Sequence, residues 1–161
     1  MSLERFHKAQ TGRSAGYHTA FAEIRAGGKR SHWIWYIFPQ IEGLGRSSTA
    51  RAYAVQDLGE ACAYLRDPIL HARYEEIVAA VSGQLTRGIR VEDLMGSQID
   101  ALKLVSSLTL FHAAAEQLEP EDPVFASLAQ GLVVLLGQTA EQGYPACDFT
   151  LSRIAESQRN G

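Results

Sequence analysis

Residues 99–112 read Ile99-Asp100-Ala101-Leu102-Lys103-Leu104-Val105-Ser106-Ser107-Leu108-Thr109-Leu110-Phe111-His112. On a helix the polar residues at 100, 103, 106 and 107 share one face because they fall three or four residues apart, and apolar side chains cover most of the rest. A helix that is apolar nearly all round normally lies at the centre of a helical domain. Its lysine must find an acceptor or lose its charge, so Asp100 and Lys103 are candidates for a pocket wall. The alternative is a narrow solvent-facing stripe whose hydroxyls bond back to the preceding turn.

The composition agrees with a helical domain around that segment. The chain has 161 residues, 46% of them hydrophobic and 20% charged, which is the balance of one globular domain and excludes a disordered tail, a collagen-like repeat or a disulfide-stapled miniprotein. Ala and Leu together number 39, against 17 for Val and Ile, which favours helices over strands. We therefore expect an all-α, compact, single-domain bundle of about six to eight helices spanning residues 1–161.

Several helix N-termini can be predicted from local capping signals in the sequence. Asp67-Pro68 and Asp122-Pro123 each place an N-cap acceptor before a proline at the first helical position, and Asp57 with Glu60 forms a capping-box pair. The expected helices cover about residues 3–10, 15–26, a segment opening at 57, 67–83, 97–117, 122–137 and 148–158. Leu85 hints at a further half turn after residue 83, and Asp148 is the expected cap of the last helix.

The cysteine and histidine spacing and the lengths of the apolar runs indicate the cellular environment of the protein. Cys62 and Cys147 show no CxxC spacing, and the five histidines form no HExxH pattern, so we expect a reduced cytoplasmic protein with no metal or cofactor. The first ten residues are too charged for a signal peptide, and the apolar runs are too short to span a bilayer. We expect no membrane partner.

The charge is distributed unevenly along the chain. The total is -3, but residues 25–51 hold five basic residues against Glu42 alone, a local charge of +4 that leaves -7 for the remainder. The basic segment suggests an anionic partner, whereas the acidic remainder disfavours nucleic acid because it would repel a long strand.

The same segment contains an aromatic cluster and a glycine turn. Four of the fourteen aromatic residues fall between Trp33 and Phe38, and Gly43-Leu44-Gly45-Arg46-Ser47 follows. One interpretation is an aromatic core plug, a turn and a Ser-capped helix. The other is an anion site made of the turn's backbone amides and Arg51, one helical turn away. The turn lacks the Walker A lysine and the dinucleotide fingerprint, so neither of those phosphate-binding folds is supported.

Three motifs occur in this order along the chain. They are Lys29-x-Ser31-His32-Trp33-x-Trp35-x-Ile37-Phe38-Pro39-Gln40, Gly43-Leu44-Gly45-Arg46-Ser47 and Asp100-x-x-Lys103-x-x-Ser106-Ser107-x-Thr109-Leu110-Phe111. Together they resemble the bacterial family called domain of unknown function 1810, over nearly the whole chain. The resemblance implies a compact, mainly α-helical single domain and no established activity. Leu108 stands where such proteins often have Met, and residues 136–148 look longer than usual.

A fainter likeness, in size and helical class rather than in a motif, is to the NADAR superfamily, helical domains that include N-glycosidases acting on phosphorylated ribosyl compounds. It implies a hydrolase of the N-glycosidase type. Such a reaction needs a carboxylate or an activated water near the departing base, and Glu42 or Asp100 could supply the carboxylate.

Two functional hypotheses remain open from the sequence. The first is a polar pocket for a small anionic, phosphate- or nucleotide-like ligand, with or without hydrolysis. In it the anion contacts Arg46, Arg51 and the amides of Gly45 and Ser47, a ring stacks on Trp33 or Trp35, and His32, Asp100 and Lys103 surround the reacting bond, with Lys29, Ser31, Ser106 and Ser107 completing the ligand-binding set. The second is a non-catalytic interaction module that uses the aromatic HWxWxIFP segment as an exposed anchor.

Overall fold

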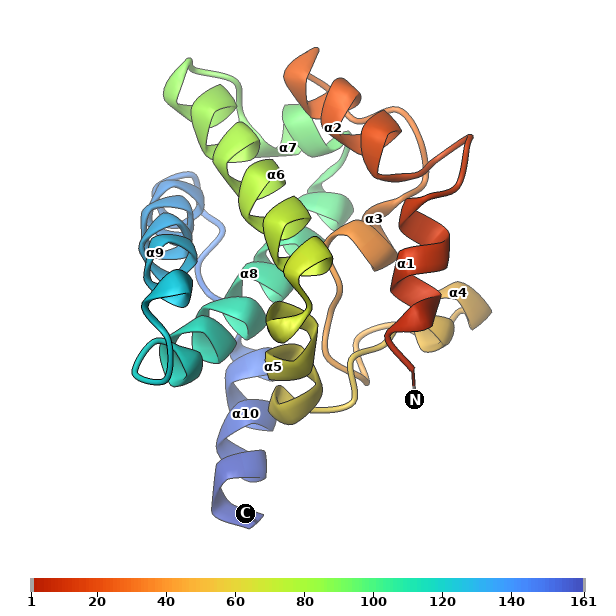
Figure 1. Ribbon diagram of the computed structural model, residues 1–161. Coiled ribbons are helices and arrows are strands. Elements are labelled where there is room, and N and C mark those ends of the chain that lie inside the picture. Colours follow the sequence, from red (N-terminus) through yellow and green to blue (C-terminus); the bar gives the residue numbers. More distant parts are fainter. Residues whose placement is uncertain (1, 161) are drawn as a thin grey trace.

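Helix α8 (Gln98–Leu118) runs through the centre of the molecule, with the other long helices packed around it (Figure 1). It begins where the Ser97 hydroxyl accepts a hydrogen bond from the Asp100 backbone amide at 3.0 Å. Most of its side chains are buried, among them Leu104, Leu108 and Phe111 at 0% exposure. The apolar segment around Lys103 is therefore the central helix, as its sequence predicts.

The structure is a computed structural model that describes residues 2–160. Within that range the chain forms one compact all-α domain of ten α-helices, seven of them at least seven residues long, one 3-10 helix and no β-strand. In chain order they are α1 (Glu4–Gln10), α2 (Tyr17–Arg25), α3 (Ile34–Ile37), α4 (Ser48–Ala52), α5 (Leu58–Arg66), α6 (Pro68–Thr86), α7 (Val91–Met95), α8, the 3-10 helix η1 (Pro123–Phe125), α9 (Ala126–Glu141) and α10 (Asp148–Asn160).

The helix starts expected from Asp-Pro pairs are confirmed. The Asp67 carboxylate accepts from the amides of Ile69 and Leu70, and Asp122 accepts from Val124. The Asp57 carboxylate caps α5 through the Glu60 amide. Two expected ends are too early: α6 continues past Gly83 to Thr86, and α9 continues past Gly137 to Glu141.

The expected number of about six to eight helices is too low. The structure adds two short helices that the sequence patterns do not reveal, α3 inside the aromatic segment and α7 before the central helix. Both are only one turn or so long, which is too short for a hydrophobic period to show. Helix α10 begins at the expected residue, Asp148, and continues past the expected end at 158 to Asn160.

An aromatic core fixes α8 against its neighbours. Phe111 of α8 lies 4.6 Å from Tyr74 of α6 and 5.0 Å from Tyr64 of α5, measured between ring centres. Phe38 extends this cluster to the end of α3, 5.9 Å from Tyr74. The aromatic segment is thus packed onto the central helix bundle, and its position relative to α8 is fixed.

The segment between α3 and α5 is held by a single parallel bridge. The Val55 amide donates to the Gln40 carbonyl at 2.9 Å, and the Glu42 amide donates to the Val55 carbonyl at 2.8 Å. These two bonds close the loop that carries α4, at the right of Figure 1.

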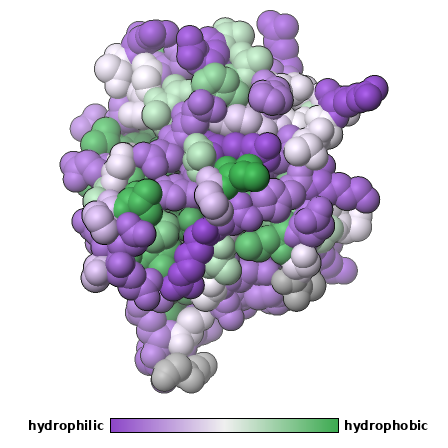
Figure 2. Space-filling model, in the orientation of Figure 1, coloured by the Kyte–Doolittle hydropathy of each residue, from purple (hydrophilic) through white to green (hydrophobic). Residues whose placement is uncertain are grey.

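In the orientation of Figure 2, hydrophobic side chains occur at the surface as small separate patches among hydrophilic ones.

Candidate functional site

A small polar pocket lies where the loop after α2, helix α3, the start of α4 and the start of α8 meet. Its volume is about 240 Å³. We call it the lysine pocket; it is lined by Lys29, His32, Ile34, Trp35, Tyr36, Ser47, Thr49, Asp100 and Lys103.

The charges of this pocket are two ammonium groups and one carboxylate. Lys29 Nζ lies 2.8 Å from Asp100 Oδ2, and Lys103 Nζ lies 3.5 Å from Asp100 Oδ1. Two of the three lysines in the sequence therefore share this one carboxylate. The Lys29 side chain is 7% exposed and that of Lys103 is 26% exposed. One positive charge is therefore left over, and the more accessible ammonium belongs to Lys103.

Both lysines also lie over indole rings. Lys29 Nζ is 5.1 Å from the Trp33 ring, and Lys103 Nζ is 4.6 Å from the ring centre of Trp35. The negative face of an indole attracts a cation at this distance, which helps to hold each ammonium in place. The pocket is thus built before any ligand arrives.

The loop that presents Lys29 and His32 is organised by Glu23 of α2, a residue that the sequence analysis missed. Its carboxylate accepts hydrogen bonds from the amides of Arg30 and Ser31, from the Ser31 hydroxyl and from the Trp33 indole, at 2.5–2.9 Å. Burial alone would raise the pKa of Glu23, but these hydrogen bonds outweigh it and hold the pKa at about 2. Glu23 is a structural anchor for this loop.

A second pocket adjoins the first, and Trp35 belongs to both. Its volume is about 190 Å³. We call it the glutamine pocket; it is lined by Trp35, Gln40, Ile41, Glu42, Gly43, Gly45, Ala50, Arg51 and Ala54. Gln40 is 2% exposed, and its amide nitrogen Nε2 has no hydrogen-bond partner in the structure.

Gly45 brings the glycine turn against Trp35. A Cβ atom at this position would lie 2.6 Å from Cη2 of Trp35 and 2.5 Å from Cβ of Ala50, closer than carbon atoms approach. Glycine is therefore required here by close approach rather than by an unusual backbone angle. The turn acts as a wall of the glutamine pocket.

The structure brings together residues that are far apart in the sequence. Of the thirteen site residues expected from the sequence, six line the lysine pocket, and Gly45 and Arg51 line the glutamine pocket with Trp35. The six are Lys29, His32, Trp35, Ser47, Asp100 and Lys103. The glycine turn and the central helix thus meet through Trp35, although Arg46, which is exposed, lines neither pocket.

Trp33 and Ser31 are placed differently from the expectation. Trp33 is 0% exposed and its indole donates to Glu23, so it offers no face on which a ligand ring could stack. Both the amide and the hydroxyl of Ser31 are used by the same carboxylate. These two residues support the loop, and neither lines the lysine pocket.

Ser106 and Ser107 also line neither of the two pockets. The Ser106 hydroxyl donates to the Leu102 carbonyl one turn earlier, at 3.0 Å. Ser107 is 0% exposed and its hydroxyl lies 2.9 Å from the Tyr74 hydroxyl in the core. The Ser106 hydroxyl thus bonds back to the preceding turn, as the alternative expects, but Ser106 is 5% exposed, so this part of the stripe does not face solvent.

The amides of the glycine turn do not form the expected anion cradle. Helix α4 has only five residues, and the Ser47 hydroxyl already accepts from the Ala50 amide at 3.1 Å. With that donor used and so short a helix, the field at this N-terminus is small. Ser47 nevertheless faces the lysine pocket, together with Thr49, which the sequence analysis missed.

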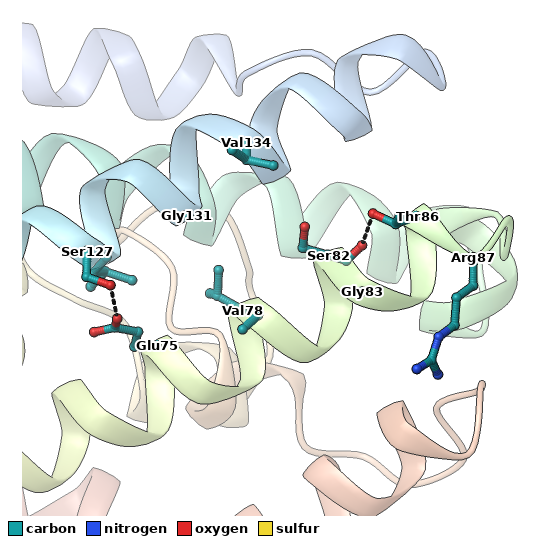
Figure 3. A pocket seen from close by; sticks show the side chains of 11 residues that line it. Glu75, Val78, Ser82, Gly83, Thr86, Arg87, Ser127, Gly131 and Val134 are labelled. Atoms are coloured by element: carbon teal, nitrogen blue, oxygen red, sulfur yellow. Dashed lines mark hydrogen bonds between the residues drawn. The ribbon is translucent and has the colours of Figure 1, made fainter.

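A larger hollow lies elsewhere, between α6 and α9 (Figure 3). It measures about 590 Å³ and is lined mostly by apolar and small residues such as Val78, Gly83 and Val134. Its one carboxylate, Glu75, already accepts from Ser127 at 2.6 Å and contacts His71. We therefore place the candidate site at the lysine pocket, where charged groups converge.

In residues 2–160 no group of three or more His, Cys, Asp or Glu side chains is arranged to hold a metal ion. Residues 123–141, which form η1 and α9, are long and apolar enough to span a bilayer by length and composition alone, and 33% of that stretch is buried. Core helices of globular proteins pass the same test.

Comparison with known proteins agrees with this fold. The crystal structure of the conserved hypothetical protein Rv1873 from Mycobacterium tuberculosis is similar, with a TM-score of 0.78 and 35% sequence identity over 95% of this chain and 96% of that one. Among curated proteins, none matches the sequence significantly. The sequence model of the family described as "Protein of unknown function (DUF1810)" matches residues 1–133. The chain therefore belongs to the DUF1810 family.

Proposed function

We propose that the protein binds a small anionic molecule in the lysine pocket. The observation that carries this proposal is the sharing of Asp100 by Lys29 and Lys103, which leaves one unmatched positive charge inside a preformed hollow. A phosphate or carboxylate group would complete the charge balance and accept a hydrogen bond from the Lys103 ammonium. The hydroxyls of Ser47 and Thr49 and the exposed imidazole of His32 line the same pocket and are further donors for such a group.

The division of work between the two lysines follows from their burial. Lys29 makes the shorter contact with Asp100 and is nearly inaccessible, so it fixes the carboxylate. Lys103 makes the longer contact and is more exposed, so it is the group that meets the ligand. Trp35, half-buried and lining the pocket, offers an apolar surface for the uncharged part of the molecule.

A hydrolytic reaction would extend the proposal. Both oxygens of Asp100 contact lysines, which makes it a positioning group rather than a general base. Glu42 is exposed and lines the neighbouring glutamine pocket, so it is the carboxylate with access to a water. We therefore propose Glu42 as the base if the protein acts as an N-glycosidase-like hydrolase on a phosphorylated compound.

The aromatic anchor of the interaction-module hypothesis has less support. Trp33, Ile37 and Phe38 are at most 2% exposed, so that of the tryptophan, tyrosine and phenylalanine rings in the segment only Trp35 and Tyr36 are partly accessible, beside the exposed His32. An anchor residue at a protein interface must reach a pocket on its partner. The HWxWxIFP segment instead fills this protein's own core.

Calorimetric titration with inorganic pyrophosphate tests the proposal. The wild type should bind it, and Lys103→Met should weaken binding about ten- to hundredfold, since a hydrogen bond to a charged group is worth about 1.5–3 kcal/mol. Lys8→Met is the matched control because Lys8 is exposed on α1, outside the pocket, and its replacement removes the same charge. Absence of binding by the wild type, or equal weakening by both variants, would refute the anion site.

A further inference from the structure

The glutamine pocket differs from the lysine pocket in the kind of group it can hold. Its two ionic residues, Glu42 and Arg51, carry opposite charges and are exposed at the surface. They leave no net charge for an anion. The buried polar group inside is the uncharged amide of Gln40. Such a lining suits a polar but uncharged group.

The side-chain nitrogen of Gln40 is a donor without an acceptor. Gln40 is 2% exposed, and its Nε2 has no hydrogen-bond partner among residues 2–160. A buried donor left unpaired costs about 1–3 kcal/mol, so buried polar groups almost always have partners. The backbone of Gln40 cannot move to find one, because its carbonyl accepts from the Val55 amide and the following bridge fixes Glu42.

A single water does not account for the pocket. A water occupies about 30 Å³ in the liquid, whereas the glutamine pocket measures about 190 Å³. The space is large enough for a small planar ring. Trp35 lines this pocket as well as the lysine pocket, so one molecule lying along the indole would reach both.

We infer that the glutamine pocket binds the uncharged ring of the same molecule whose anionic group lies at Lys103. This inference rests on the proposed anion site and adds the ligand class: a phosphorylated compound that carries a nitrogen heterocycle with a hydrogen-bond acceptor at its edge. A glutamine amide pairs with such an edge through two hydrogen bonds, as it does with the N6 and N7 atoms of adenine. The ring contacts Trp35, and Gln40 selects it.

Binding of AMP and UMP, compared with ribose 5-phosphate, tests this inference. All three carry the same phosphate, and only the first two carry a ring. We expect the wild type to bind AMP or UMP at least tenfold more tightly than ribose 5-phosphate. In Gln40→Met this advantage should fall to less than threefold, while the affinity for ribose 5-phosphate stays within twofold. Gln130→Met, on the exposed face of α9, is the matched control and should keep the advantage.

A measurement on the wild type covers the case in which Gln40→Met does not fold. In nitrogen-15 spectra the side-chain amide of Gln40 should shift on addition of AMP or UMP and stay unchanged with ribose 5-phosphate. If ribose 5-phosphate and pyrophosphate bind but neither nucleotide binds more tightly, the ring site is refuted and the anion site stands. If none of them binds, both are refuted.

Discussion

The Lys103 ammonium lies 4.6 Å from the ring centre of Trp35, and this contact joins the central helix to the aromatic segment at the point where two pockets meet. The two residues are 68 positions apart in the sequence. Lys103 reaches Trp35 because Asp100, one turn earlier on α8, holds the same ammonium at 3.5 Å. The geometry of the site therefore depends on how Asp100 is held, and Lys29 holds it.

Lys29→Met should destabilise the fold more than Lys103→Met. Lys29 is 7% exposed and makes the 2.8 Å contact with Asp100, so its loss leaves a largely buried carboxylate with one distant partner. We expect the free energy of unfolding in urea to fall by about 1–3 kcal/mol for Lys29→Met and by less than about 1 kcal/mol for Lys103→Met. Equal losses would show that the two lysines share Asp100 evenly, contrary to the division of work described above.

The unfolding free energy should decrease at acid pH in part through Glu23. Its pKa is about 2 in the folded protein and near 4.5 when the group is free, so the unfolded chain takes up the proton first as pH falls. The stabilisation is fully present above about pH 4.5 and is lost as the pH approaches 2. Urea titrations between those limits should show a shallower pH dependence for Glu23→Gln than for the wild type. Parallel curves for the two proteins would contradict this role.

Gly45→Ala should destabilise the protein and disturb Trp35. The new Cβ would lie 2.6 Å from the indole, and overpacking of this kind typically costs about 1–3 kcal/mol. Gly83→Ala is the matched control, because a Cβ there meets nothing within 4 Å. On a helix that change should stabilise by up to about 1 kcal/mol. Thermal denaturation and tryptophan fluorescence report both effects; an unchanged spectrum and melting temperature for Gly45→Ala would refute the close contact.

Ser107→Ala should lower stability without changing anion binding. The hydroxyl lies 2.9 Å from the Tyr74 hydroxyl inside the core, so its removal leaves the tyrosine unpaired at a cost of about 1–3 kcal/mol. The residue is outside the lysine pocket, and the affinity for pyrophosphate should stay within twofold. A large loss of affinity for pyrophosphate in a folded Ser107→Ala protein would show that Ser107 contributes to the anion site, contrary to this account.

The helices that begin with a strong local signal could be predicted from the sequence. Asp67-Pro68, Asp122-Pro123 and Ser97 each start a helix because a cap satisfies free backbone amides within three residues, which is a purely local interaction. Helices α3 and α7 could not be predicted, because one turn shows no period. Gly137 predicts too early an end for α9, because the helix continues to Glu141 and buries Thr139 at 0% exposure beyond that glycine.

The candidate site could be predicted only in part, because long-range contacts decide which residues of the motifs line the pockets. Trp33 and Trp35 are two residues apart in the same motif, yet one is buried in the core and the other lines both pockets. Glu23 distinguishes the two, because its carboxylate accepts a hydrogen bond from the Trp33 indole. No pattern in the sequence distinguishes Glu23 from other helical glutamates. Gln40 did carry a signal: it is a polar residue that directly follows an aromatic and apolar run.

A crystal structure of the protein with inorganic pyrophosphate, at a concentration that saturates binding in solution, tests the anion site most directly. The account predicts pyrophosphate in the lysine pocket, with one of its oxygens within hydrogen-bonding distance of Lys103 Nζ and the Lys29–Asp100 contact retained. Pyrophosphate bound at another place, with the lysine pocket empty, would contradict it.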